Sequence, residues 1–143
     1  MSPISLRLAD WDSLREHARA VRYAVFVVEQ AVPVELEWDE FDAVSWHAVA
    51  YDSDGNPIAT GRLLPDGHIG RMAVLRTSRG TGIGGAILDA LMTKAAELGY
   101  RELVLNSQTV AMPFYARYGF VPESDEFMEA GIPHRVMRRK TLE

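Results

Sequence analysis

The chain has 143 residues, of which 48% are hydrophobic and 24% charged, so it carries enough apolar material for one globular domain, expected over residues 1–143. A formal net charge of −5 argues against general nucleic-acid binding, and zero cysteines exclude disulfides, thiolate metal sites and a cysteine nucleophile. No apolar run approaches the roughly 20 residues of a membrane span, and Asp10 and Asp12 interrupt any signal-peptide pattern. A cytoplasmic protein is therefore expected.

The N-terminal half shows strand, helix and hairpin patterns in turn. Residues 4–8 alternate apolar and polar side chains, which is typical of a strand. Asp10 is a candidate N-cap for a helix reaching to about residue 30. Its apolar face, spaced by three and four, consists of Trp11, Leu14, Ala18, Val21, Val25 and Val28. An acidic loop or short helix over 31–42 and a hairpin of strands 46–51 and 58–64 follow.

The stretch 69–91 is the most informative part of the chain, because an apolar run, a glycine-rich loop and a helical pattern follow one another there. The loop carries two arginines and the glycines Gly80, Gly82, Gly84 and Gly85. Glycines at a strand-to-helix junction let the backbone approach a ligand closely. The free N–H groups and the dipole of the helix start favour an anion. The stretch therefore predicts a binding site for a pyrophosphate. The alternative is a tight turn without a ligand, whose arginines are solvated.

Three classes of pyrophosphate ligand compete for this loop. A nucleoside-triphosphate loop needs Lys and Ser/Thr after its last glycine, whereas Ala86 and Ile87 follow here. A dinucleotide pattern G-x-G-x-x-G is satisfied, but the strand 102–105 ends in Asn-Ser-Gln without the acidic residue that holds a ribose. About 60 residues follow the glycines, too few for two mononucleotide halves. Coenzyme A is the third class, and it is favoured by a family resemblance of the loop rather than by elimination.

The C-terminal half completes an α/β pattern. Gly99 is a candidate C′ cap for the helix that follows the glycines. A buried strand, a short helix over 111–118 and two final strands joined through 131–133 come next. The predicted order β-α-β-β-β-α-β-α-β-β indicates one mixed sheet with helices on both faces.

Several motifs resemble one known family. Arg79-x-x-Gly82-x-Gly84 resembles the R/Q-x-x-G-x-G/A motif of the GNAT superfamily of acyl-CoA-dependent N-acetyltransferases, and residues 114–120 resemble its FY-x-x-x-GF segment. Residues 22–39 and 127–137 resemble the ElaA- and YjcF-like branch, so that the resemblance runs from about residue 6 to 140. It implies the GNAT fold, a single mixed and mostly antiparallel sheet of about seven strands with strands 4 and 5 splayed apart. It also implies acetyl-CoA as co-substrate and no metal.

The resemblance places coenzyme A in this splay. The residues that it implies as cofactor contacts are Met72, Ala73, Val74, Arg79, Gly80, Thr81, Gly82, Ile83, Gly84, Gly85, Asn106 and Tyr115. A backbone N–H near Ala73 or Val74 would polarise the thioester carbonyl. The Tyr115 phenol would assist the leaving sulfur, although an ordinary phenol pKa near 10 exceeds that of a thiol near 8.5. Aromatic packing is the alternative role, and we assign it to Phe114 and Phe120.

The resemblance also implies a base and an acceptor site. An alkyl amine with a pKa near 10.4 is mostly protonated at neutral pH and must lose a proton before attack. The Gly-x-Pro-His turn resembles that of glyphosate acetyltransferases, whose histidine at this position is the base, which makes His134 the first candidate. Glu29, acting through a water, is the second, and a solvated turn histidine is the plain alternative. The implied acceptor contacts are Arg71, Glu29, Gln30, Gln108 and His134. His47 is a weaker candidate, and His17 and His68 are expected to be solvated.

The acceptor is less well specified. Arg71 aligns with an arginine that grips an anionic acceptor in the glyphosate enzymes, but Gln108 and Val27 stand where those enzymes have further arginines, which argues against a dianion. Glu29 and the acidic residues of 35–42 are candidates to hold a cationic amine.

The leading hypothesis is acetyl transfer to a small primary amine by direct attack in a ternary complex. A protein lysine or N-terminal acetyltransferase and a non-catalytic acyl-CoA sensor stay open. A homodimer through the final strands is compatible with the superfamily, and no nucleic-acid or membrane partner is expected.

Overall fold

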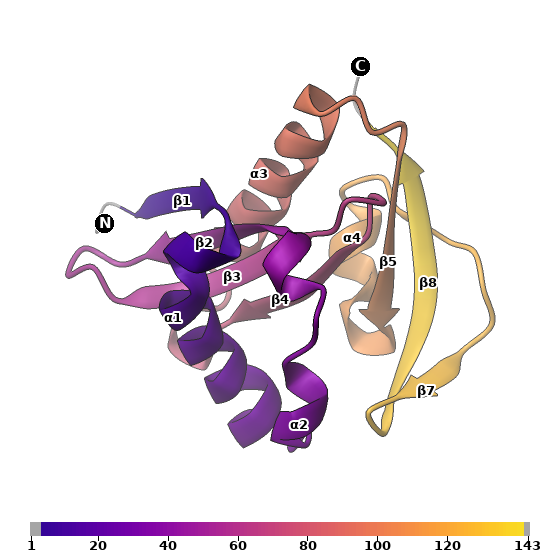
Figure 1. Ribbon diagram of the computed structural model, residues 1–143. Helices are drawn as coiled ribbons and strands as arrows, with labels where there is room; N and C mark the ends of the chain where they lie inside the picture. Colours follow the sequence, from indigo (N-terminus) through magenta and orange to yellow (C-terminus); the bar gives the residue numbers. More distant parts are fainter. Residues whose placement is uncertain (1–3, 142–143) are drawn as a thin grey trace.

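A computed structural model of the chain describes residues 4–141. Two sheets and several helices follow one another along the sequence (Figure 1). In chain order they are β1 (Ser5–Ala9), α1 (Trp11–Arg22), a π-helical segment (Tyr23–Glu29), α2 (Val34–Glu37), a 3₁₀ turn (Asp42–Val44), β2 (Trp46–Tyr51), β3 (Pro57–Leu63), β4 (Ile69–Val74), a 3₁₀ turn (Arg76–Ser78), α3 (Ile83–Glu97), β5 (Glu102–Gln108), a 3₁₀ turn (Thr109–Ala111), α4 (Met112–Ala116), β6 (Val121–Pro122), β7 (Phe127–Glu129) and β8 (Ile132–Lys140).

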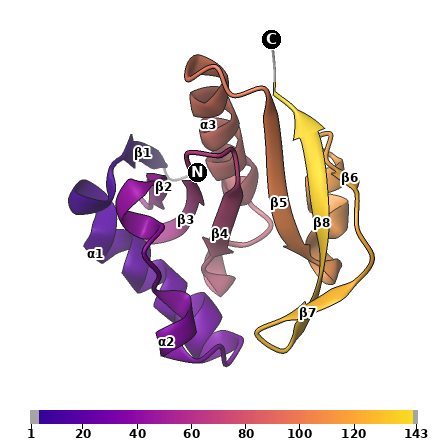
Figure 2. The ribbon, with the colours of Figure 1, turned by 45° about the vertical axis from the view of Figure 1, so that its right-hand side comes forward.

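The strands divide into an N-terminal and a C-terminal sheet. β1, β2, β3 and β4 are hydrogen-bonded in that order, each antiparallel to the next. β5, β8 and β6 form the second sheet, and β7 pairs with β8. Figure 2 shows β4 and β5 diverging from the end where they are closest. The predicted mixed, mostly antiparallel fold with splayed strands 4 and 5 is confirmed, but two sheets replace the predicted single one.

One β-bridge pairs the backbones of the two sheets. Within residues 4–141, the pairing between the sheets is a single parallel bridge of His68 with Val104. A backbone hydrogen bond from the Val104 N–H to the Gly67 carbonyl, at 3.2 Å, lies beside it. Beyond this bridge the facing edges of β4 and β5 have no partner strand, so their backbone groups are available to a ligand between them.

The first helix changes its geometry halfway along the predicted apolar face. Asp10 caps α1 by accepting a hydrogen bond from the Ser13 N–H at 2.9 Å, as predicted. The chain then continues as a π-helix over Tyr23–Glu29, whose wider turn rotates the following side chains. Val25 is still buried, but Val28 is 67% exposed. The prediction that Val28 belongs to the core face is therefore wrong.

The helices cover both faces of the N-terminal sheet. Figure 1 shows α1 in front of β2 and β3 and α3 behind them, and these elements are in contact. Ile87, Leu88 and Leu91 of α3 are fully buried in the main core. The glycine-rich loop is thereby held at the rim of the opening between the sheets, because α3 begins directly after it.

A β-bulge interrupts β4 on its way to the glycine loop. Thr60 pairs with Ala73 and Arg62 with Gly70, so two residues of β4 lie opposite the single residue Gly61. Arg71, within the bulge, has a φ of 51°, which is unusual for a residue with a side chain. A Cβ atom at Gly61 would lie 2.6 Å from the Met72 sulfur. Because Gly61 has no side chain, the Met72 side chain can pack directly against the backbone of β3.

The last strands form a hairpin and a short edge. β7 and β8 are joined by Ala130 and Gly131, both with positive φ, where the sequence predicts a joint over 131–133. β6 is an additional two-residue strand on β8.

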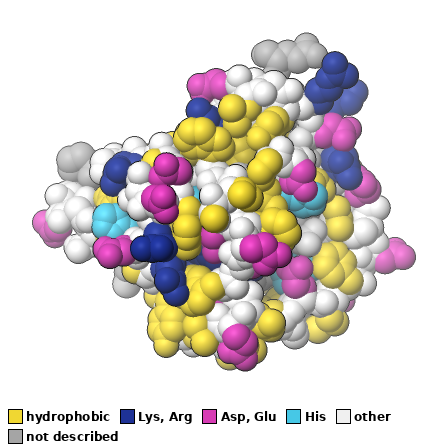
Figure 3. Space-filling model, viewed as in Figure 1, with side chains coloured by type: hydrophobic (Ala, Val, Ile, Leu, Met, Phe, Trp, Pro, Cys, Tyr) yellow, Lys and Arg dark blue, Asp and Glu magenta, His cyan; other side chains and the backbone are white. Residues whose placement is uncertain are grey.

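The described residues contain no helix that is long and apolar enough to cross a membrane. On the face that Figure 3 shows, acidic and basic side chains are interspersed without an extended basic surface.

Candidate functional site

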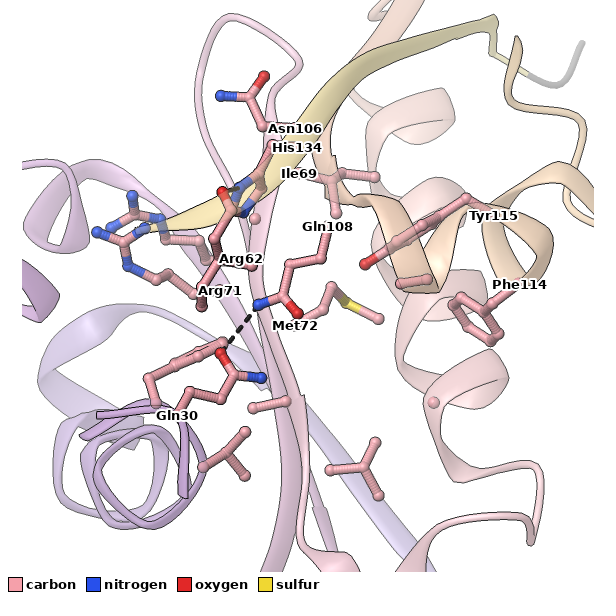
Figure 4. Close-up of a pocket in the computed structure, with 18 of the residues that line it drawn as sticks. Gln30, Arg62, Ile69, Arg71, Met72, Asn106, Gln108, Phe114, Tyr115 and His134 are labelled. Atoms are coloured by element: carbon pink, nitrogen blue, oxygen red, sulfur yellow. Dashed lines mark hydrogen bonds between the residues drawn. The ribbon is translucent and has the colours of Figure 1, made fainter. Parts of the chain in front are cut away.

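The opening between the two sheets is a cavity of about 920 Å³. Its walls come from the π-helical segment, α2, β4, the glycine loop, α4, β5 and the β7–β8 hairpin (Figure 4). Most predicted site residues line it: Gln30, Arg71, Met72, Ala73, Val74, Arg79, Gly80, Gly82, Ile83, Gly84, Gly85, Asn106, Gln108, Tyr115 and His134. Glu29 and Thr81 do not line it. The volume lies within the range of small-molecule sites.

The glycine loop ends in an uncapped helix start. Gly82 is the N-cap of α3 with a φ of 85°, and Gly80 has a φ of 77°, so both adopt left-handed conformations that favour glycine. No side chain of the described residues caps α3. The backbone N–H groups of its first turn are therefore left for an external acceptor, and the helix dipole favours an anionic one.

Arg79 and Glu29 form an ion pair beside this loop. Both terminal nitrogens of Arg79 donate to the Glu29 carboxylate, each at 2.7 Å, and Arg79 Nε donates to the Val74 carbonyl at 2.9 Å. The hydrogen bond from Arg79 lowers the pKa of Glu29 below its ordinary value. An ionised carboxylate held by arginine is a weak proton acceptor, so this geometry favours His134 over Glu29 as the base.

Gly85 has a packing role that the motif does not reveal. A Cβ atom at this position would lie 2.0 Å from the hydroxyl oxygen of Tyr118. Tyr118 follows α4, so the missing side chain lets this aromatic residue pack on the first turn of α3. Packing therefore suffices to explain a glycine at this position, whatever contact its backbone makes with a ligand.

Tyr115 combines a fixed ring with a hydroxyl that reaches the cavity. The side chain is only 9% exposed, and its ring contacts Phe114 and Phe120 edge-on at centroid distances of 5.0 and 6.1 Å. Figure 4 shows the hydroxyl pointing toward the space between the sheets. Burial raises the pKa of Tyr115 well above its usual value, so the phenol keeps its proton and can donate a hydrogen bond.

His134 lies on β8 opposite Gln108 of β5 and is 6% exposed. Its Nδ1 is 2.7 Å from the carbonyl oxygen of Ile132. A carbonyl can only accept, so this contact assigns the hydrogen of the neutral imidazole to Nδ1. The lone pair is then on Nε2, which lies 3.5 Å from an oxygen of Glu129. Phe127 stacks on the ring at 6.0 Å. This tautomer can take a proton at Nε2.

Two glutamines bridge the cavity. Gln108 Nε2 donates to Gln30 Oε1 at 2.9 Å and so ties the end of β5 to the residue after the π-helix (Figure 4). Asn106, two residues earlier on β5, is exposed, and its side-chain nitrogen lies 3.4 Å from Glu129 Oε1. The bridge between the two glutamines narrows the cavity between β5 and the end of the π-helix.

A largely buried cluster of three arginines and three carboxylates forms another part of the cavity wall. Arg22 donates to Glu37 and to Asp42, each at 2.7 Å. Arg62 bonds to Asp39 at 2.6 Å and to Asp42 at 2.9 Å. Arg71 completes the cluster, with contacts of 3.2 Å to Glu37 and 3.1 Å to Asp39.

These pairings change the interpretation of the acidic loop. The sequence suggests that residues 35–42 hold a cationic amine, but three of their carboxylates are neutralised by arginines of the same protein. Burial opposes ionisation of Asp39, yet hydrogen bonds from Arg62 outweigh it and lower its pKa. Arg71 is likewise committed to two carboxylates rather than free for an anion.

The remaining histidines are outside the cavity or at its edge. His47 is buried, with Nε2 2.9 Å from the Asp42 carbonyl oxygen and its ring 4.7 Å from that of Trp11, so its role is structural. His17 is part-buried, with Nδ1 2.7 Å from the Tyr51 hydroxyl, so the expectation that it is solvated is wrong. His68 is exposed, as expected, and lines the cavity beside Asp66.

Arg62 and Glu129 are among the lining residues that the sequence analysis missed. Arg62 is 6% exposed, and its Nε has no hydrogen-bond partner among the described residues. A charged residue within the mostly apolar strand 58–64 was the available signal. Glu129 had no such signal, because its place beside His134 depends on the pairing of β7 with β8.

Comparison with known proteins is consistent with this geometry. The family model described as Acetyltransferase (GNAT) domain matches residues 14–141. The uncharacterized N-acetyltransferase YjcF of Bacillus subtilis (strain 168) is 44% identical over 123 residues, which cover 83% of this chain and 87% of the relative. An acyl-CoA N-acyltransferase from Pseudomonas aeruginosa is similar in structure with a TM-score of 0.86 and 31% identity, covering 96% and 99% of the two chains. Escherichia coli ElaA has a TM-score of 0.84 at 27% identity, covering 96% and 99%.

Proposed function

Since the chain is an acyltransferase of the GNAT family, in the branch of ElaA and YjcF, we propose that it transfers an acetyl group from acetyl-CoA to the primary amine of a small molecule. The observation that carries the proposal is the shared cavity, which the uncapped start of α3, the Tyr115 hydroxyl and His134 all line. Acetyl-CoA and the amine occupy it together, and the amine attacks the thioester directly.

The geometry of the opening supports the position of the cofactor. The pyrophosphate accepts hydrogen bonds from the first turn of α3, and Arg79 leaves Glu29 to pair with it. The pantetheine arm follows the unpaired edges of β4 and β5 beyond the bridge of His68 with Val104. An amide-bearing arm suits these edges, because it can satisfy backbone donors and acceptors in the manner of a strand.

The chemistry uses two side chains at the end of this arm. His134 Nε2 takes a proton from the amine, whose nitrogen then forms a bond with the carbonyl carbon. A backbone N–H of β4 near Ala73 or Val74 stabilises the negative charge on the carbonyl oxygen. The bond from carbon to sulfur breaks, and the sulfur receives a hydrogen bond from the Tyr115 phenol. Glu29 has no part in these steps.

The walls of the cavity favour a small acceptor over a protein lysine. The Gln30–Gln108 bridge crosses it. Leu36 of α2 also lines it, and its carbonyl lies 3.4 Å from an Arg71 nitrogen. A peptide needs an open groove for the residues that flank its lysine. The presence of Tyr115 and a base-competent tautomer of His134 supports an enzyme rather than an acyl-CoA sensor.

Ligand-dependent unfolding tests the cofactor first. Acetyl-CoA at about 100 times its dissociation constant should stabilise the chain by roughly 2.7 kcal/mol, whereas NAD should not. Coenzyme A release is then followed with a panel of amines. His134→Gln should keep the stabilisation by acetyl-CoA and lose on the order of 10²–10⁴-fold in turnover. An equal shift with NAD, or none with acetyl-CoA, would contradict the proposal.

A further inference from the structure

The cavity has three acidic side chains among its described lining residues, and two of them are already neutralised. Glu37 and Asp39 are held by arginines at 3.2 Å or less. Glu129 differs, because it forms no ion pair with an arginine or lysine within residues 4–141. Glu129 is therefore the acidic side chain of this cavity that no arginine or lysine of the described residues neutralises.

Glu129 and His134 face each other with no donor between them. The neutral tautomer of His134 has a lone pair on Nε2, and the Glu129 oxygen 3.5 Å away is also an acceptor when the carboxylate is ionised. His134 Nε2 and this Glu129 oxygen both gain a hydrogen bond when a third group donates to each of them. An alkylammonium has three N–H donors and a positive charge, so it satisfies both.

The surrounding side chains hold this pair in place. Phe127 stacks on the His134 ring, and the Asn106 amide lies 3.4 Å from the second Glu129 oxygen. Apolar residues from other walls of the same cavity offer contacts to the body of an amine: Leu36, Phe41, Leu64 and Ile69. An amine with an aromatic or aliphatic body therefore finds a charged end and an apolar wall in one site.

We infer that Glu129 is the specificity residue for the acceptor, holding its ammonium group beside His134 Nε2, so that the enzyme selects amines that are cationic in solution. This inference rests on the proposed function. The bound ammonium gives one proton to His134 Nε2, and the neutral nitrogen attacks the thioester. The second proton, lost as the amide forms, leaves with the sulfur as the thiol of coenzyme A, and His134 returns its proton to water.

The test compares Glu129→Gln with a matched control. Glu40→Gln removes an exposed charge of the acidic loop, and Glu40 forms no ion pair with the described residues. Phenethylamine serves as the cationic probe and aniline as an amine that is uncharged at neutral pH. Their binding to the protein saturated with coenzyme A is followed by the NMR signals of the His134 imidazole. KM and kcat with acetyl-CoA are measured for both amines.

Phenethylamine should shift the His134 signals of the wild-type protein, and Glu129→Gln should weaken this binding at least tenfold. KM for phenethylamine should rise by the same factor with kcat little changed, while aniline is unaffected and Glu40→Gln behaves as wild type. Equal losses for the two amines, unchanged binding in Glu129→Gln, or a wild-type His134 that does not respond would each overturn the inference. Failure of acetyl-CoA to stabilise the wild-type protein would instead overturn the proposed function.

Discussion

Tyr115 shows how burial sets the role of a single side chain. Because burial raises its pKa, proton transfer from the phenol to a thiolate is even less favourable than for a solvated tyrosine. The phenol therefore stabilises the leaving sulfur by a hydrogen bond. Tyr115→Phe should lower kcat roughly tenfold and leave the affinity for acetyl-CoA nearly unchanged, a smaller loss than removal of a base. Steady-state kinetics measure this, and a loss as large as that of His134→Gln would make Tyr115 the acid.

His47 links stability to pH. Burial, only partly offset by the hydrogen bond to the Asp42 carbonyl, lowers the pKa of His47 below its ordinary value of 6.5. As the pH falls through 6.5, His47 of the unfolded chain therefore binds a proton, whereas His47 of the folded protein stays neutral. The free energy of unfolding should therefore decrease between about pH 7.5 and 5.5.

Urea unfolding of the wild-type protein and of His47→Gln at the two ends of this range measures the effect. The glutamine keeps a donor near the Asp42 carbonyl but cannot titrate, so its pH dependence should be flatter. Parallel curves for the two proteins would assign the dependence to other groups.

The sequence motifs predicted which residues belong to the site better than they predicted where the side chains point. Tyr115 and His134 follow from short motifs, and both reach the cavity. Glu29 was a candidate base and acceptor contact, yet its carboxylate, at the end of the π-helix, pairs with Arg79. A carboxylate 50 positions from its arginine leaves no local signal of the pairing.

At the scale of secondary-structure elements, α3 and the residues after α4 are fitted to each other at Gly85. Gly85→Ala should destabilise the protein by about 1–3 kcal/mol, because its Cβ would overlap the Tyr118 hydroxyl. Tyr118→Phe removes that oxygen, so the double variant should recover part of the loss. Chemical denaturation of the four proteins gives the coupling energy. Additive effects would show that overlap with the Tyr118 hydroxyl is not the cause of the loss.

The elements themselves were predicted well where their pattern is regular. The amphipathic part of α1, the hairpin and α3 follow from spacing and caps. The π-helix and the bulge at Arg71 were not predicted, since each departs from the regular hydrogen bonding that periodicity reports. A positive φ at an arginine runs against local preference and is imposed by the surrounding strands. Both irregular elements border the cavity.

At the scale of the whole molecule, the cluster of six charges joins α1, the acidic loop, β3 and β4. Arg22 is 1% exposed and bonds to two carboxylates. Arg22→Met should cost about 3–5 kcal/mol, because it leaves an uncompensated buried negative charge. Arg22→Lys keeps the positive charge but not the forked geometry of the guanidinium, so its stability should lie between those of the wild type and of Arg22→Met. Denaturation midpoints measure this series. A loss below about 1 kcal/mol for Arg22→Met would show that the other arginines compensate.

The division into two sheets explains why long-range architecture was harder to predict than local elements. Spacing in the sequence predicts strands but not which edges remain unpaired, and the splay of β4 from β5 was expected only through the family resemblance. The bridge of His68 with Val104 adds a practical consequence. Beyond it the facing edges of β4 and β5 are unpaired in the described structure, so this part of the fold opens more readily when no ligand lies between the strands, and a locally opened chain is a substrate for cellular proteases. The lifetime of this protein in the cell should then follow the supply of acetyl-CoA, so that starvation for acetyl groups removes the enzyme as well as its substrate.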